Sequence, residues 1–361
     1  MYKKLFRELG IYILTGLLIW YCIILISGGV SVQSGIVNAV DRCLNVIIPS
    51  LFAFMAASQI LISGGFYYYV SLPFYPLSRF LLRIPTGFFF VFLLGNLAGY
   101  PIGIKLLSDM VEGGKISKRT AEKMSCYCYC GGPAFYAGAV GLAVFRCTGA
   151  GIAVFLSIVA ANLIIGIAMG FFGRGKEVCG KPKVCFKAEI LTDSVISAGK
   201  SLFVICVFIV FFSTVMSAFD YYDIFDKIKT VFGISDNAVT LIKSCLEISC
   251  VTELEGSPFK LLPYIAGICS FGGLCVIIQV IAISGGRISL TPFLLSRIPA
   301  AFLTAVICRL IYPSFIPDSL EASASEAVTF GIMNNFIPSI CLIMMILLLI
   351  LKKRLAFSKT V

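Results

Sequence analysis

Long apolar runs separated by short polar stretches dominate the chain. About eight of these runs approach the roughly 20 residues that a helix needs to cross a bilayer. The expected spans are residues 9–27, 44–62, 125–145, 148–172, 201–219, 261–283, 292–312 and 329–351. The pattern predicts an all-α polytopic membrane protein that forms a single membrane domain over residues 1–361.

Two further apolar segments depart from a simple span. Residues 86–106 carry several glycines, Asn96 and Pro101 near their centre, and residues 239–256 carry several charges, Glu247 among them. Glycine and proline interrupt helices, and charged side chains are costly inside a bilayer. We expect both segments to form re-entrant hairpins, each of which enters and leaves the membrane on one side.

Loop charges favour this arrangement. Lysine and arginine gather at the N-terminus, after residue 172 and at the C-terminus, whereas the loops after residues 219 and 312 are poor in them. Basic loops stay in the cytoplasm. With two re-entrant hairpins, these basic loops and both termini fall on the cytoplasmic side, and Arg146 in a short outer turn is the exception. If both segments crossed, the basic loop after residue 172 would lie outside.

The topology then contains an inverted repeat. Residues 44–172 and 191–312 each read as one span, one hairpin and two spans, with opposite orientation, while 9–27 and 329–351 flank them. Such repeats with broken helices are typical of secondary transporters. Gly131–Gly132 and Gly272–Gly273 would occupy equivalent positions. The alternative is that these glycine pairs only allow close packing of helices.

Composition narrows the chemistry. The chain is 59% hydrophobic with a mean hydropathy of +1.00, against about 45–50% apolar residues in soluble proteins. Its net charge of +11 comes from residues in loops and tails, where basic residues set the orientation of a protein in the membrane. We therefore expect no nucleic-acid partner. There is no histidine, and the 15 cysteines fit small apolar side chains in a reducing compartment. No phosphate-binding loop, dinucleotide fingerprint or G-x-S-x-G motif is found. We expect no enzymatic activity, no cofactor and no metal, even at Cys126, Cys128 and Cys130.

The hairpin tips are the candidate site. Non-helical backbone is tolerated at membrane depth only where it is buried in protein or lines a wet cavity. Free helix N-termini suit anions, and unwound carbonyls suit cations. The candidate substrate-binding residues are Gly95, Asn96, Gly99, Tyr100, Pro101, Gly131, Gly132, Glu247, Ser249, Thr252, Gly272, Gly273 and Gln279, and Glu247 and Glu253 are candidates for Na⁺ or H⁺ coupling.

Two of these interpretations have structural alternatives. Glu247 either serves transport or forms a buried pair with Lys243, four residues earlier on a helix, and we favour the role in transport. Lys105 and Lys243 either attract an anionic substrate or extend their amino groups to the membrane interface, and we favour the interface.

Residues 95–141 resemble the YlbJ (SpoVV-type) sporulation integral membrane proteins, which carry a nucleoside-recognition or Gate domain. The resemblance rests on the "GYPIGIK" turn, on the loop over residues 114–122, and on "CYCGGPAFYAGAVG". The "CYCYC" stretch departs from the expected family pattern, where Asn or Ser is more usual. The domain is also similar to part of the concentrative nucleoside transporters, which hold substrate between two opposed hairpins.

The resemblance implies a multi-pass protein of the outer forespore membrane that moves dipicolinate, a small organic anion, by alternating access. One alternative is a cation-coupled nucleoside-like transporter. Another is a gating or scaffold component of a sporulation membrane complex, which does not itself transport. The expected partners are the substrate anion, membrane lipid and further copies of the chain.

Overall fold

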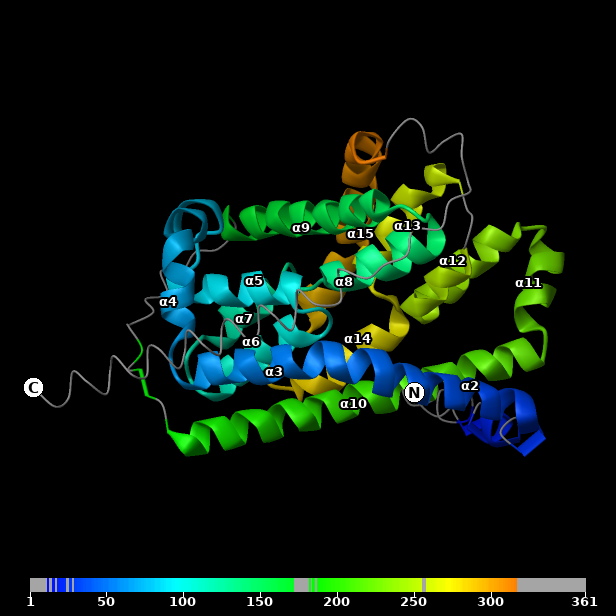
Figure 1. The fold of residues 1–361 in the computed structure, drawn as a ribbon, viewed down its shortest axis with the longest axis horizontal. Coiled ribbons are helices and arrows are strands. Elements are labelled where there is room, and N and C mark those ends of the chain that lie inside the picture. Colours follow the sequence, from blue (N-terminus) through cyan, green and yellow to red (C-terminus); the bar gives the residue numbers. More distant parts are fainter. Residues whose placement is uncertain are drawn as a thin grey trace, which may run out of the picture. The chain divides into compact units, whose positions relative to one another are not determined.

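The computed structural model describes residues 12–316, except for residues 13–14, 17, 24–25, 28, 172–181, 183, 186 and 255–257. This part of the chain is helical and contains no strand (Figure 1). The elements of the first half are α2 (Gly29–Arg42), η1 (Cys43–Ile47), α3 (Ile48–Ser63), α4 (Tyr67–Ser71), η2 (Leu72–Phe74), η3 (Leu77–Leu81), η4 (Thr86–Phe88), α5 (Phe89–Leu97), α6 (Ile102–Glu112), α7 (Lys118–Ser125), α8 (Pro133–Phe135), η5 (Tyr136–Val144) and α9 (Thr148–Phe171). Those of the second half are α10 (Ala188–Tyr221), α11 (Ile224–Phe232), α12 (Asp236–Leu246), η6 (Ile248–Leu254), η7 (Phe259–Leu261), α13 (Leu262–Phe271), α14 (Gly273–Ser284), α15 (Thr291–Ile311) and η8 (Tyr312–Ser314).

In the described residues, 4 helices are long and apolar enough to cross a membrane, namely Thr148–Phe171, Ala188–Tyr221, Phe259–Ser284 and Thr291–Ser314. A fifth candidate is the pair Leu51–Ser63 and Tyr67–Phe74, which is bent by 103°. These helices support the predicted multi-pass membrane protein. The count of about eight spans and the re-entrant course of the two hairpins stay predictions.

Most of the predicted spans have a helical counterpart. Residues 148–172, 201–219, 261–283 and 292–312 fall on α9, α10, α13–α14 and α15, and residues 44–62 fall on η1 and α3. The described positions within 15–27 are also helical. The predicted span 329–351 lies outside the described residues.

The expected span over residues 125–145 is wrong. Helix α7 ends at Ser125, the chain is non-helical from Cys126 to Gly132, and helix returns only from Pro133 to Val144. The sequence Gly131-Gly132-Pro133 explains the interruption, because a residue before proline avoids the helical conformation and glycine is a poor helix former. Gly132 has a φ of +81°, which other residues rarely adopt.

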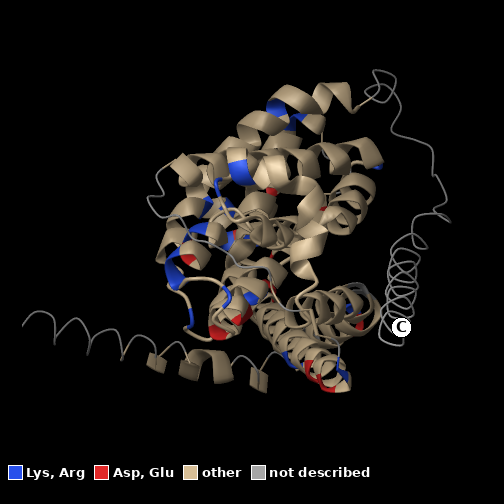
Figure 2. Cartoon of the chain, turned by 90° about the vertical axis from the view of Figure 1, so that its left-hand side faces the viewer, with Lys and Arg blue, Asp and Glu red and all other residues tan. Residues whose placement is uncertain are grey.

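Long helices pack side by side around this interruption. Helix α10 runs along α2 and α3, while α15 packs against both α13 and α9 (Figure 1). Small residues allow close approach: a Cβ added at Gly267 of α13 would lie 3.1 Å from the carbonyl oxygen of Ala301 in α15. Figure 2 shows that charged residues are sparse along the helices, with long uncharged stretches between them.

Candidate functional site

The first predicted hairpin is two helices joined by a short turn. Helix α5 ends at Leu97 and α6 begins at Ile102, with Gly99 between them at a φ of +91°. The break therefore lies where the glycines and Pro101 predict it. The peptide bond between Tyr100 and Pro101 is cis.

The non-helical segment Cys126–Gly132 packs directly against this hairpin. A Cβ at Gly95 would lie 2.8 Å from the carbonyl oxygen of Cys128, and one at Gly103 would collide with the same oxygen. A Cβ at Gly132 would lie 3.2 Å from the carbonyl oxygen of Leu97. Glycine at these positions lets two backbones touch, which brings the first glycine pair to the turn of the first hairpin.

Two asparagines satisfy the backbone of that segment. Asn162 of α9 donates from Nδ2 to the carbonyl of Tyr129 at 2.9 Å and to Oδ1 of Asn96 at 2.8 Å. Asn96 donates to the carbonyls of Phe92 at 2.8 Å and Tyr127 at 3.4 Å. A buried carbonyl outside a helix needs such a donor. Both amides thus hold the hairpin, the segment and α9 together, and a contact between Asn96 and substrate stays a prediction.

The second predicted hairpin is a helix followed by a tight 3₁₀ turn. Helix α12 ends at Leu246, and Glu247 is extended, with φ −135° and ψ 113°. The Glu247 carboxylate accepts hydrogen bonds from the backbone N–H of Ser249 at 3.0 Å and from its hydroxyl, and it lies 3.9 Å from the guanidinium of Arg42. Thr252 Oγ1 donates to the carbonyl of Ser249 at 2.9 Å and is exposed.

The considered pairing of Lys243 with Glu247 is wrong. Lys243 Nζ lies 2.9 Å from a carboxylate oxygen of Asp220 and 3.6 Å from one of Glu253. Helical i, i+4 neighbours face each other only while the helix continues, and α12 stops before Glu247. Glu253, a candidate coupling residue, therefore pairs with Lys243.

The second glycine pair connects the two broken segments. Helices α13 and α14 are separated at Gly272, whose φ is +90°. A Cβ there would collide with the hydroxyl of Tyr129, from the segment beside the first hairpin. A Cβ at Gly273 would lie 3.3 Å from the carbonyl of Ser244 and the amide of Ile248, on either side of the second break. Each glycine pair thus packs against the break that precedes it, as the proposed equivalence expects; the inverted repeat itself stays a prediction.

Tyrosines fill the space at the first turn. The Tyr100 and Tyr136 hydroxyls are 2.8 Å apart, and Tyr136 also accepts the N–H of Gly131 at 2.8 Å. Tyr100 donates to the carbonyl of Cys269 near the end of α13, and its ring lies 4.6 Å from that of Tyr129. The first turn is thereby hydrogen-bonded to the broken α13–α14 helix.

Two predicted polar residues lie apart from this cluster or have other partners. Gln279 is buried and donates to Cys275 Sγ at 3.3 Å. Lys105 is buried as well, with Nζ 2.6 Å from Asp109 and 3.3 Å from the hydroxyl of Ser197. The expectation that Lys105 extends to the membrane interface is therefore wrong, because its amino group is buried and pairs with Asp109 on the next turn of α6.

Arg297 is the residue that sequence reasoning missed. It lies on α15, is 1% exposed, and donates to the carbonyls of Cys126 and Ser270, the latter at 3.5 Å. Its guanidinium lies 4.8 Å from the ring centres of both Tyr129 and Phe293. In the described part of the chain no carboxylate pairs with it. An arginine inside an apolar span is a functional signal by default, and this signal was available in "FLLSRIPAAF".

Comparison with known proteins adds a family. No family model and no solved structure matches the chain. A curated protein, the sporulation integral membrane protein YlbJ of Bacillus subtilis (strain 168), is 26% identical over 302 residues, which cover 74% of each chain. The chain is therefore similar to a sporulation integral membrane protein over about three quarters of its length. The resemblance first read from residues 95–141 is thereby confirmed.

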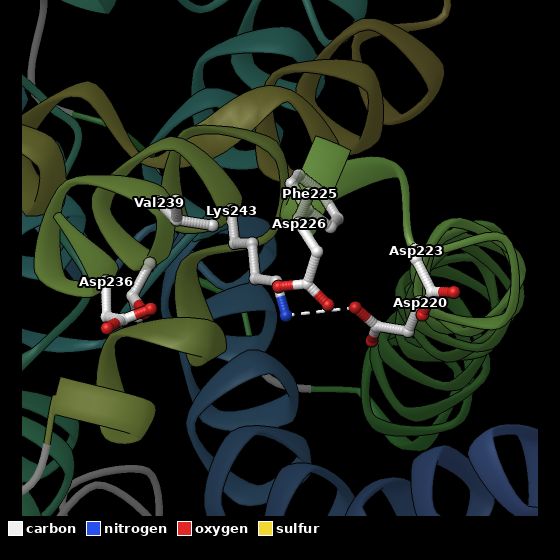
Figure 3. Close-up of a pocket in the computed structure, with 8 residues that line it drawn as sticks. Asp220, Asp223, Phe225, Asp226, Asp236, Val239 and Lys243 are labelled. Atoms are coloured by element: carbon white, nitrogen blue, oxygen red, sulfur yellow. Dashed lines mark hydrogen bonds and ion pairs between the residues drawn. The ribbon is translucent and has the colours of Figure 1, made fainter. Parts of the chain in front are cut away.

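An acidic cavity of about 150 Å³ lies beside the second break (Figure 3). Its lining joins the end of α10, α11 and α12, and Lys243 reaches across it to Asp220. The remaining lining residues are Asp223, Phe225, Asp226, Asp236, Val239 and Thr240. No group of Cys, Asp and Glu in the described residues is arranged to hold a metal ion, and this includes Cys126, Cys128 and Cys130.

A smaller cavity of about 50 Å³ has the opposite charge. Arg83 and Lys123 line it together with Thr120 and Tyr127. Tyr127 follows Cys126, whose carbonyl binds Arg297. One residue that lines the basic cavity is therefore adjacent in sequence to a residue that binds the Arg297 guanidinium.

Proposed function

We propose that this YlbJ-type protein carries a small organic anion, with dipicolinate as the candidate, across a sporulation membrane by alternating access. One observation carries the proposal: two broken helical segments meet at Gly272–Gly273, beside the buried and uncompensated charge of Arg297. A purely structural helix bundle would not need interrupted helices in its apolar interior, because each interruption leaves backbone groups to be satisfied.

The electrostatics of this meeting point favour an anion. Helices α6 and α14 begin at the first turn and at Gly273, and a helix N-terminus carries partial positive charge. Arg297 adds a full positive charge in the same region. Dipicolinate is a planar aromatic dianion, so its carboxylates suit these groups, and its ring suits the surrounding tyrosines.

Cation coupling is a second part of the proposal. Glu247 is 8% exposed and lies where the second segment breaks, with the hydroxyl and amide of Ser249 directed at its carboxylate. A carboxylate next to unwound backbone is the usual arrangement for Na⁺ or H⁺ in a carrier. We propose that Glu247 is the coupling group. Its carboxylate would release Arg42 when it binds the coupling Na⁺ or H⁺.

The experiment is uptake of labelled dipicolinate and of labelled uridine into proteoliposomes, with and without gradients of Na⁺ or H⁺. Accumulation of dipicolinate above that of protein-free liposomes supports the proposal. Accumulation of uridine alone would favour the cation-coupled nucleoside-like carrier. Failure of both substrates, with protein correctly inserted, would contradict transport and favour a gating or scaffold component.

A further inference from the structure

We propose that Arg297 and Ser270 form a carboxylate-binding subsite, in which the anion takes over hydrogen bonds that now tie two segments of the protein together. The inference rests on the proposed function, because it assigns the residues that hold the transported anion. The subsite lies on α15 and at the end of α13. Neither helix contains any of the substrate-binding residues that the sequence predicts.

The donors of the subsite are not fully used within the protein. Arg297 Nε and the Ser270 hydroxyl are buried and have no hydrogen-bond partner among the described residues. Both residues are 1% exposed. A buried polar atom without a partner costs free energy, so two such donors on neighbouring residues are a specific signal for an acceptor ligand.

The partners that Arg297 does have are weaker than a carboxylate. Its two terminal nitrogens hold backbone carbonyls, one from Cys126 and one from Ser270, and Ser296 Oγ lies 3.1 Å from Nη2. A carboxylate accepts two parallel hydrogen bonds from the guanidinium and neutralises its charge, which neutral carbonyls cannot do. An arriving carboxylate would therefore displace them.

The displacement has a mechanical consequence. Cys126 begins the non-helical segment beside the first hairpin, and Ser270 lies two residues before the Gly272 break. Arg297 links both through one guanidinium, while Tyr129 covers it and sets its hydroxyl against Gly272. When a carboxylate occupies the guanidinium, this link between the first hairpin and the α13–α14 helix is released. Substrate binding thereby loosens the α13–α14 helix, which packs on the second break through Gly273, from the segment beside the first hairpin.

A basic cavity contains a residue that is adjacent in sequence to a partner of Arg297. The basic cavity lined by Arg83, Lys123 and Tyr127 attracts anions by its charge. Tyr127, which lines that cavity, directly follows Cys126, the residue whose carbonyl binds Arg297. On the predicted topology the cavity faces the cytoplasm, which is the side from which the resemblance expects substrate to arrive.

The test is equilibrium binding of labelled dipicolinate to purified, detergent-solubilised full-length protein. Arg297→Lys keeps the charge and a donor but loses the two-pronged geometry, and Ser270→Ala removes the second donor. Arg309→Lys on the same helix is the matched control, because Arg309 is exposed, and Thr304→Val is the control for a buried unpartnered hydroxyl. We expect Arg297→Lys to weaken binding about tenfold or more and Ser270→Ala about threefold or more, with both controls within about twofold of the wild type.

Competition sharpens the assignment. Benzoate, which has one carboxylate, should displace labelled dipicolinate from the wild type and lose that ability in Arg297→Lys, whereas uridine should not displace it. Wild-type affinity in a folded, monodisperse Arg297→Lys protein, or no binding of dipicolinate to the wild type, would overturn the subsite. Uptake by the wild type with unchanged binding in Arg297→Lys would overturn the subsite alone, and binding without uptake would overturn the transport proposal alone.

Discussion

The two breaks in the helical core are held in place by different kinds of interaction. The first break is fixed by neutral groups: Asn96 and Asn162 bind backbone carbonyls, and Gly95 and Gly103 lie against the carbonyl of Cys128. The second break is fixed by charges, with Glu247 near Arg42 and Lys243 bound to Asp220. The side chains of Arg42 and Asp220 are 45% and 53% exposed.

This difference indicates which of the two breaks can move at a low cost in free energy. Buried hydrogen bonds are expensive to leave unmade, so the first break is rigid. Each ion pair at the second break has one half-exposed partner, and ion pairs that water can reach contribute little, so the second break is adjustable. We expect substrate to be held near the first break while the second opens and closes.

The largest expected effect is at the first break. Gly103→Val places side-chain atoms on the backbone carbonyl of Cys128, and overpacking of a tight core costs about 1–3 kcal/mol or more. We expect loss of folded protein, measured as the monodisperse fraction in size-exclusion chromatography. Gly199→Val on α10, where a Cβ meets nothing within 4 Å, is the control. Equal yields of both variants would show that the first break tolerates displacement.

A smaller loss is expected when one amide is removed. Asn162→Leu deprives Tyr129 and Asn96 of a donor, and a buried acceptor left without a partner costs about 1–3 kcal/mol. The melting temperature in detergent should fall. An unchanged melting temperature would mean that the amide network does not hold the first break.

At the second break we expect a still smaller effect on stability. Glu247→Gln keeps the side-chain volume and loses the charge that faces half-exposed Arg42, a pair worth up to about 1 kcal/mol at the surface. The melting temperature should stay near that of the wild type, while accumulation of dipicolinate driven by an ion gradient is lost. A large fall in melting temperature would assign Glu247 to structure, and full gradient-driven accumulation would remove it from coupling.

The smallest effect on stability is expected for the exposed ion pair between Lys229 of α11 and Asp236 of α12. The hydrogen bond from Lys229 to Asp236, and the charge of that carboxylate, raise the pKa of Lys229 above its ordinary value. A raised pKa in the folded state means that the contribution is present at neutral pH and is lost as pH rises through the lysine range. The melting temperature of Lys229→Ala should therefore differ from that of the wild type by a small amount at pH 7, because both side chains are solvated, and the difference should shrink as pH rises through the lysine range. A larger difference at pH 11 would contradict the pairing.

Some features of the fold and the site could be predicted from the sequence, and others could not. Glycines, Pro101 and the charged stretch around Glu247 located both breaks, because helix-breaking and charged residues act locally. The prediction of a helix over residues 125–145 was wrong. It relied on the average apolar character of the segment and did not weigh the three consecutive residues Gly131-Gly132-Pro133, which interrupt the helix. The network around Asn162 joins residues far apart in the chain, so no local pattern predicts it. Arg297 was visible as a lone charge in an apolar run, but its lack of a carboxylate partner needed the three-dimensional structure.

The most direct test of the carrier account is counterflow. Proteoliposomes are loaded with unlabelled dipicolinate, diluted into a trace of labelled dipicolinate, and followed without any ion gradient. A carrier that exposes one site alternately to each side concentrates label transiently inside, and we expect this for the wild type and for the Arg309→Lys control but not for Arg297→Lys. Label that only equilibrates, or that never enters, would contradict alternating access around the two breaks.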